Sequence, residues 1–225
     1  TQHSLGLVLR DQGNRTTGDT ATTLLSQAVE AHRAALTTLT LEVLPQDWAW
    51  IQTGLGNALR AQSTHTTGES TTSLLAQAVE AHRAALMVFT KEAFPQDWAK
   101  THIDLGDVLG HQSTRAVGET RAALLSQAIE AYHAALTVFT KKTSPQNWAM
   151  TQNNLGIALS NQGEHTRGEA GASLLAQAVE AYQAALAVLP KDELLWSSVK
   201  YNLFVARRKQ EFHHRLNQSN PETPH

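Results

Sequence analysis

The chain has 225 residues, of which 41% are hydrophobic and 17% charged, and its formal net charge is −2. This composition is typical of a folded globular protein. The near-neutral balance argues against a nucleic-acid partner, which a protein usually binds through a basic surface. The absence of cysteine excludes disulfides and thiolate metal ligands. No apolar run reaches the ~20 residues that cross a membrane, so we expect no membrane partner and a cytoplasmic location.

An internal repeat of fifty residues runs through the chain. The segment 24–36 returns with few changes at 74–86, 124–136 and 174–186. The first copy lacks the Pro-Gln-Asp-Trp-Ala block that opens the second at Pro45, and the chain has no initiator methionine, so we expect a piece of a longer polypeptide. We assign repeat 1 to residues 1–44, repeat 2 to 45–94, repeat 3 to 95–144, repeat 4 to 145–191, a capping helix to 192–216 and a disordered tail to 217–225.

Each repeat has the periodicity of two helices. In the second repeat, apolar residues recur at three- and four-residue steps and predict a helix over about residues 70–92. A first helix is expected over about 46–62, because Pro45 suits a first helical turn. The polar segment 63–68 between them ends in glycine and is typical of a loop. No useful run alternates with period two, so the sequence predicts an all-α fold.

A glycine recurs inside each first helix, although glycine there costs about 1 kcal/mol relative to alanine. We attribute Gly56 and its equivalents to the close approach of the second helix of the same repeat. The facing residues in that helix are expected to be small alanines, such as Ala78, Ala81, Ala84 and Ala85. In the last segment Phe204 replaces the glycine, as expected of a terminal helix that has no following partner.

The repeat resembles the tetratricopeptide repeat. Leu55-Gly56 matches the first helix of that family, and Ala128-x-x-x-Tyr132 and Ala178-x-x-x-Tyr182 match the second. The repeat departs from the family in its length of fifty residues and in the position of its tryptophan, seven residues before the leucine. It looks like the long variant of bacterial multidomain proteins. The resemblance implies a right-handed α-solenoid of antiparallel helix hairpins with a C-terminal capping helix.

Comparison of the repeats with one another indicates where a ligand would bind. Positions 50, 53, 57 and 60 of the first helix share one face and change in chemistry from repeat to repeat. They also match the positions that line the binding groove in the tetratricopeptide family. The alternative is that these are unconstrained solvent positions. The predicted groove residues are His3, Leu7, Arg10, Trp50, Thr53, Asn57, Arg60, Lys100, Ile103, Asp107, Met150, Asn153 and Ile157.

Other polar residues are expected to serve the structure. His32 and His82 stand in the slot that tyrosine fills in later repeats, which favours packing over metal binding. At the loop position of Arg15, His65, Arg115 and His165, we expect an ion pair with the acidic residue four positions later. Glu80 and its equivalents recur in every repeat, whereas a catalytic residue is singular. We therefore expect no metal, no cofactor and no enzymatic activity.

The sequence predicts two classes of function. The first is a scaffold that binds a partner protein or peptide in the groove, as the sensor or adaptor part of a larger bacterial protein. The second is a structural module that self-associates into a homo-oligomer through its N-terminal repeat edge. The basic cluster at Arg207, Arg208, Lys209 and Arg215 could contact nucleic acid or anionic lipid, but a solvated face of the capping helix is favoured, because Glu211 interrupts it.

Overall fold

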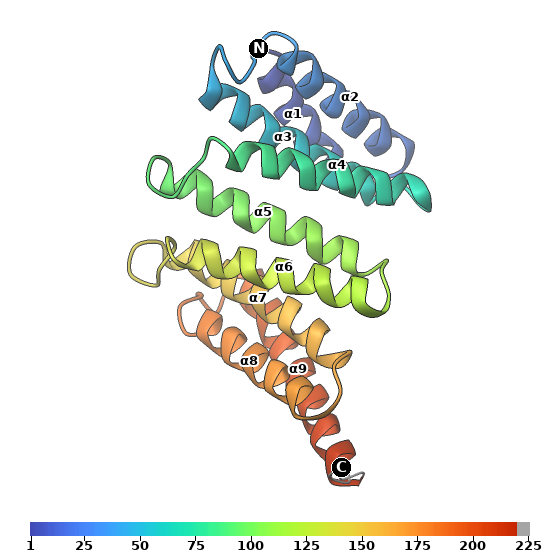
Figure 1. Cartoon of the computed structure of the whole chain (residues 1–225), viewed down its shortest axis with the longest axis vertical. Coiled ribbons are helices and arrows are strands. Elements are labelled where there is room, and N and C mark those ends of the chain that lie inside the picture. The colour runs from blue at the N-terminus through green and yellow to red at the C-terminus, as the bar shows by residue number, and fades with distance from the viewer. Residues whose placement is uncertain (220–225) are drawn as a thin grey trace. The chain divides into compact units, whose positions relative to one another are not determined.

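The computed structural model describes residues 1–219. This part of the chain consists of helices joined by loops and contains no strands (Figure 1). The chain divides into two compact units: Thr1–Arg115 holds α1 to α5, and the second unit begins at Ala116 and holds α6 to α9. The helices are α1 (Gln2–Asn14), α2 (Gly18–Leu36), α3 (Pro45–Ser63), α4 (Glu69–Leu86), α5 (Pro95–Ser113), α6 (Gly118–Leu136), α7 (Pro145–Glu164), α8 (Gly168–Leu186) and α9 (Leu194–Ser219).

Within each unit, every helix packs on the helix that follows it. In the first unit α1 and α2 form one hairpin and α3 and α4 the next, and α5 packs on α4. In the second unit α6 packs on α7, α7 pairs with α8, and α9 covers α8. This confirms the predicted all-α architecture of stacked helical hairpins. The right-handed course of the solenoid stays a prediction.

The ends of the helices follow from local sequence. Pro45, Pro95 and Pro145 each occupy the first turn of a helix, where a missing backbone N–H costs nothing. The loop between α3 and α4 ends at Gly68, whose φ of +67° lies in the left-handed region that favours glycine. The predicted loop over 63–68 therefore agrees with the structure to within one residue, since α3 ends at Ser63.

Two helix ends differ from the prediction. The second helix of repeat 2 ends at Leu86, not near residue 92. The backbone N–H of Val88 bonds back to the carbonyl of Ala85, which tightens the last turn, and the chain then turns so that Phe89 enters the core. At the other end, α9 continues to Ser219 and includes residues 217–219 of the predicted tail. The remainder of that tail, residues 220–225, lies outside the described residues.

The core is made of alanines and leucines, with a buried phenylalanine in two of the connections between repeats. Leu55, Leu59 and Leu75 are buried between the helices of the first unit. Phe89 joins Ala49 and Ala85 in a cluster on which partly buried apolar side chains pack: Trp48, Val88, Phe94 and Trp98. Phe139 is equally buried in the second unit. Each hairpin thus buries its apolar stripe only by stacking on its neighbours, as repeat proteins do.

The glycine of the first helix faces an aromatic or imidazole ring, and not the alanines that we expected. A Cβ placed on Gly56 would lie 2.6 Å from Nε2 of His82, and one on Gly156 would lie 2.7 Å from Cε1 of Tyr182. Both rings belong to the second helix of the same repeat and are buried. The glycine is therefore required because a flat, rigid ring lies directly on the helix backbone. The packing role assigned to His82 agrees with this geometry.

Hydrogen bonds tie each repeat to the next. Gln62 of α3 donates to Oγ of Ser26 in α2 at 2.8 Å, and in the second unit Gln162 donates to Ser126 at 2.9 Å. Arg33 of α2 also donates to the side-chain oxygen of Gln77 in α4 at 2.6 Å. The side chain of Gln77 thus bridges adjacent repeats. None of the helices in the described part of the chain combines the length and the apolar character of a membrane span.

Candidate functional site

The residues predicted to form the groove lie on the first helices of the hairpins, α1, α3, α5 and α7. We call this set the first-helix face; it comprises His3, Leu7, Arg10, Trp50, Thr53, Asn57, Arg60, Lys100, Ile103, Asp107, Met150, Asn153 and Ile157. On α3, Trp50 is 39% exposed and Thr53 and Asn57 are half-buried, whereas Leu55 and Leu59 of the same helix are buried. The helix thus separates a packing side from a side that solvent reaches.

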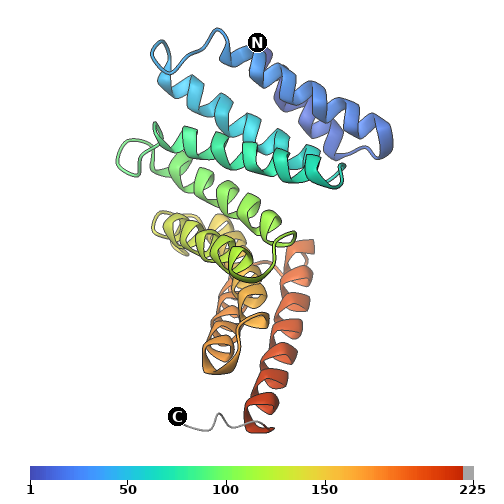
Figure 2. The ribbon, with the colours of Figure 1, turned by 45° about the vertical axis from the view of Figure 1, so that its right-hand side comes forward.

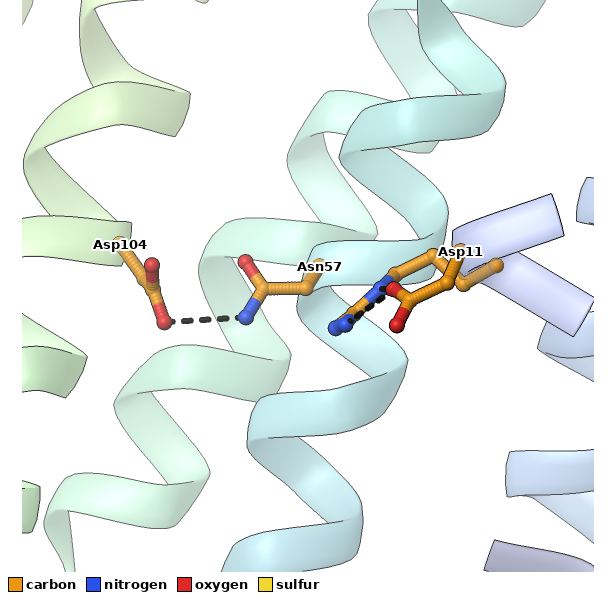
Figure 3. Close-up of polar contacts among 4 residues, drawn as sticks. Asp11, Asn57 and Asp104 are labelled. Atoms are coloured by element: carbon orange, nitrogen blue, oxygen red, sulfur yellow. Dashed lines mark hydrogen bonds and ion pairs between the residues drawn. The ribbon is translucent and has the colours of Figure 1, made fainter. Parts of the chain in front are cut away.

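Polar side chains of the first helices gather near the centre of the first unit, and one hydrogen bond joins two of these helices. Asn57 of α3 donates from Nδ2 to Oδ2 of Asp104 on α5 at 3.0 Å (Figure 3). On α1, Arg10 donates to Oδ1 of Asp11 from Nε at 3.1 Å and from Nη2 at 2.8 Å. Three neighbouring first helices therefore bring amide, guanidinium and carboxylate groups to one region.

Burial shapes the electrostatics of this region. It raises the pKa of Asp104 above the ordinary value, although the hydrogen bond from Asn57 and the nearby cations, Arg60 first among them, act in the opposite direction. Oδ1 of Asn57 and Nε of Arg60 are buried and have no hydrogen-bond partner. An unpaired acceptor and an unpaired donor thus lie one turn apart on α3. Because solvent does not reach these two atoms, a ligand would contact other parts of the half-buried side chains of Asn57 and Arg60.

Aromatic rings border the same helices at their N-terminal ends. The ring of Trp50 lies 6.2 Å from that of Phe89 in a tilted arrangement. On α5 the ring of Trp98 contacts His102 edge-on at 4.4 Å, and burial lowers the pKa of His102. Trp50 combines an anchored ring with an exposed edge. Large aromatic side chains of this kind provide much of the binding energy at protein interfaces.

On α1 the three predicted residues are half-buried. The Nδ1 of His3 lies 3.3 Å from Nδ1 of His32, whose ring is fully buried beneath Gly6 and Gly54. Burial is the main cause that lowers the pKa of His3; Asp47 raises it and Arg10 lowers it further. His3 is therefore engaged with a core ring, and Arg10 with Asp11, whereas Leu7 contributes an apolar, partly exposed side chain.

On α5, Lys100 is exposed, and Ile103 and Asp107 are half-buried. In the second unit, Met150 and Ile157 of α7 are exposed, but Asn153 is only 7% exposed. Its Oδ1 accepts a hydrogen bond from Nδ2 of Asn202 on α9 at 3.1 Å. The prediction that Asn153 faces a ligand is therefore corrected, because α9 already occupies this side chain.

Sequence reasoning missed Asp104, which is the hydrogen-bond partner of Asn57. The signal was present, since position 54 varies as Gly54, Asp104 and Asn154. The prediction of loop ion pairs is also wrong at three positions. In the described structure Arg15, His65 and His165 form no ion pair with the acidic residue four positions later. The spacing of four brings side chains together only within one helix, and here a glycine with positive φ intervenes.

The described part of the chain contains no group of three or more histidine, aspartate or glutamate side chains placed to hold a metal ion. The sequence matches no family model and no curated protein.

Proposed function

We propose that the chain is a scaffold that binds a partner protein or peptide along the first-helix face, of which Asn153 is no longer counted a part. The observation that supports this most is the contrast between neighbouring positions of one helix. Leu55, Gly56 and Leu59 recur in the repeats and pack inward. Trp50 and Asn57 lie on the other side of the same helix, are partly exposed, and differ in chemistry from their equivalents. A stacked array that keeps its packing side constant and varies the other side is suited to recognising different parts of one ligand.

The polar centre of the first unit suggests how a peptide would be bound. A polar group of the peptide would contact the half-buried side chains of Asn57 and Arg60. An apolar side chain of the peptide would contact Trp50. We further propose that the chain belongs to the tetratricopeptide-like repeats and is a cytoplasmic sensor or adaptor part of a larger bacterial protein. It would bind its partner without catalysing a reaction.

A selection experiment tests this proposal. Peptides selected from a random displayed library against the full chain should lose at least tenfold in affinity in the Trp50→Ala variant, or about 1.4 kcal/mol. Met87→Ala is the matched control, because Met87 is an exposed apolar side chain that lies outside the first-helix face. Equal affinities for the wild type and the Trp50→Ala variant would contradict the proposal.

Self-association is the second candidate, and α1 carries the observation that favours it. Leu5 is 48% exposed, whereas its equivalents Leu55, Leu105 and Leu155 are buried. Val8, one turn later, is exposed as well. This uncovered packing side of α1 could be covered by a second copy of the chain. Light scattering over a range of concentrations tests the idea: a strictly monomeric chain contradicts it, and an oligomer abolished by Leu5→Glu supports it.

A further inference from the structure

The last helix, α9, carries an exposed aromatic stripe on the side opposite to its packing side. Val199 and Ala206 are fully buried and lie seven residues apart, so they mark the side that packs within the second unit. On the other side Tyr201 is 67%, Phe204 59% and Phe212 60% exposed. Steps of three and four residues, with Arg208 between the last two, place these side chains along one line of the helix. The last turns of α9 extend past the end of α8 (Figure 2).

A further hairpin of the same kind cannot cover this stripe. In α3 and α7 a ring of the next helix packs on the glycine. A Cβ placed on Gly56 would lie 2.6 Å from His82, and one on Gly156 would lie 2.7 Å from Tyr182. Phe204 occupies the corresponding position of α9, because it lies eight residues after Trp196, as Gly56 lies eight residues after Trp48. Its side chain fills the space that such a ring would need. Whatever covers α9 must therefore dock in a different manner from the repeats.

Positive charge borders the stripe. α9 carries five cationic side chains and a single acidic one, although the whole chain has a formal net charge of −2. Lys209 is engaged with Glu164 of α7. Lys200 lies over the ring of Trp196 at 4.9 Å and Arg208 over that of Phe204 at 5.8 Å, so these cations sit beside the aromatic rings. The surface thus combines an aromatic line one helix wide with cationic side chains beside it and, at Arg208, within it.

We infer that α9 is a second docking surface, and that its occupant is an amphipathic helix of a partner protein with acidic residues beside its apolar side. The line of Tyr201, Phe204 and Phe212 fits the apolar side of one helix laid along α9. The cationic border selects acidic flanks. A membrane fits less well: Arg208 lies within the stripe and pairs with Glu211 at 3.6 Å, so insertion into lipid would desolvate this pair.

Binding of a synthetic peptide tests the inference directly. The probe is an amphipathic helical peptide with leucines on one side and glutamates on both flanks, labelled for fluorescence anisotropy and titrated with the full chain. We expect it to bind and to bind more weakly at high salt. The same peptide with lysines in place of the glutamates should not bind. Equal binding of both peptides, or binding of neither, overturns the inference.

Matched variants locate the binding on α9. Arg207→Glu together with Arg208→Glu should weaken binding at least tenfold. Lys141→Glu together with Lys142→Glu is the control, because it makes the same charge change at exposed residues of the same unit and should leave affinity unchanged. Phe204→Ala with Phe212→Ala should abolish binding without lowering the unfolding temperature, since both side chains are exposed. Retained binding in either α9 variant overturns the inference.

The other occupants give distinct results. Vesicles of phosphatidylcholine and phosphatidylserine that bind the chain through Phe204 and Phe212, without peptide binding, would assign the stripe to a membrane surface. A concentration-dependent dimer lost in the same alanine variant would assign it to a second copy. Either result overturns the inference. Trp50→Ala should not affect binding of the acidic peptide, so failure of this inference and failure of the first-helix face are told apart.

Discussion

At the scale of single residues, the contact between glycine and ring explains why the first helices accept a helix-destabilising residue. Gly56→Ala should lower the free energy of unfolding by about 1–3 kcal/mol, because the new methyl group would press on the buried ring of His82. Gly110 of α5 is the matched control, since a Cβ there meets no atom within 4 Å. Gly110→Ala should stabilise the helix by about 1 kcal/mol. Urea unfolding that gives both variants the same sign would contradict this explanation.

The buried histidines make stability depend on pH. Burial first, and Arg60 second, lower the pKa of His82 from 6.5 to about 3. Burial, followed by His3 and Arg10, lowers the pKa of His32 from 6.5 to about 4. Below pH 6.5 the unfolded chain binds protons that the folded imidazoles do not bind. The two histidines should therefore leave the free energy of unfolding unchanged above pH 6.5. Below pH 6.5 each should lower it by about 1.4 kcal/mol per pH unit. Urea unfolding at pH 7 and pH 5 measures this fall.

The tyrosines of later repeats supply the control for this pH effect. Tyr132 and Tyr182 fill the slots that correspond to His32 and His82. A His32→Tyr and His82→Tyr double variant should lose less stability between pH 7 and pH 5. Some dependence should remain, because burial also lowers the pKa of His3, His102 and His111. An unchanged dependence in the double variant would show that the two buried rings do not cause it.

At the scale of elements, one kind of hydrogen bond between repeats is present at two of its equivalent positions and absent at the position between them. Gln62 and Gln162 each donate to a serine of the preceding repeat, Ser26 and Ser126. The corresponding partner of Gln112 is Ala76, which has no hydroxyl group. Ser26→Ala should cost about 0.5–1.5 kcal/mol, and Ala76→Ser should stabilise the first unit by no more than that. Thermal unfolding in which Ser26→Ala is neutral would show that this bond adds nothing.

The periodicity of the sequence predicted the helices well because every hairpin repeats the same apolar stripe and the same proline and glycine signals. Pro45 and Gly68 mark boundaries that the structure reproduces closely. What sequence reasoning missed depends on how two helices meet. The ring of His82 over Gly56 and the bond from Asn57 to Asp104 join residues 26 and 47 positions apart. Neither contact follows from the periodicity of one helix.

The burial of the candidate residues could be predicted only in part, and their role in binding stays a prediction. The alternation of fixed and varying positions correctly separated Leu55 and Leu59, which are buried, from Trp50, which is exposed. It could not show that α9 would occupy Asn153, because the last helix departs from the repeat pattern. Variation between repeats thus identifies positions free of the common packing, while packing specific to one repeat has to be observed.

At the scale of the whole molecule, stability should be a sum of neighbouring contacts, and not a property of one core. Ala206→Asp places an unpaired charge in the fully buried contact of α9 and should destabilise the second unit by several kcal/mol. Hydrogen exchange should then show lost protection in α7 and α8 and retained protection in α1 to α3. Arg207→Asp, at the exposed neighbouring position, is the control. A uniform loss of protection over the whole chain would contradict this account.

The central claim, that a partner binds along the first helices, is tested most directly by the two methionines of the chain. Met150 lies on the first-helix face, and Met87, at the end of α4, lies outside it; both side chains are exposed. A selected peptide titrated into protein with ¹³C-labelled methionine methyl groups should shift the NMR signal of Met150 and leave that of Met87 in place. A peptide that binds tightly and shifts only Met87 would contradict the claim.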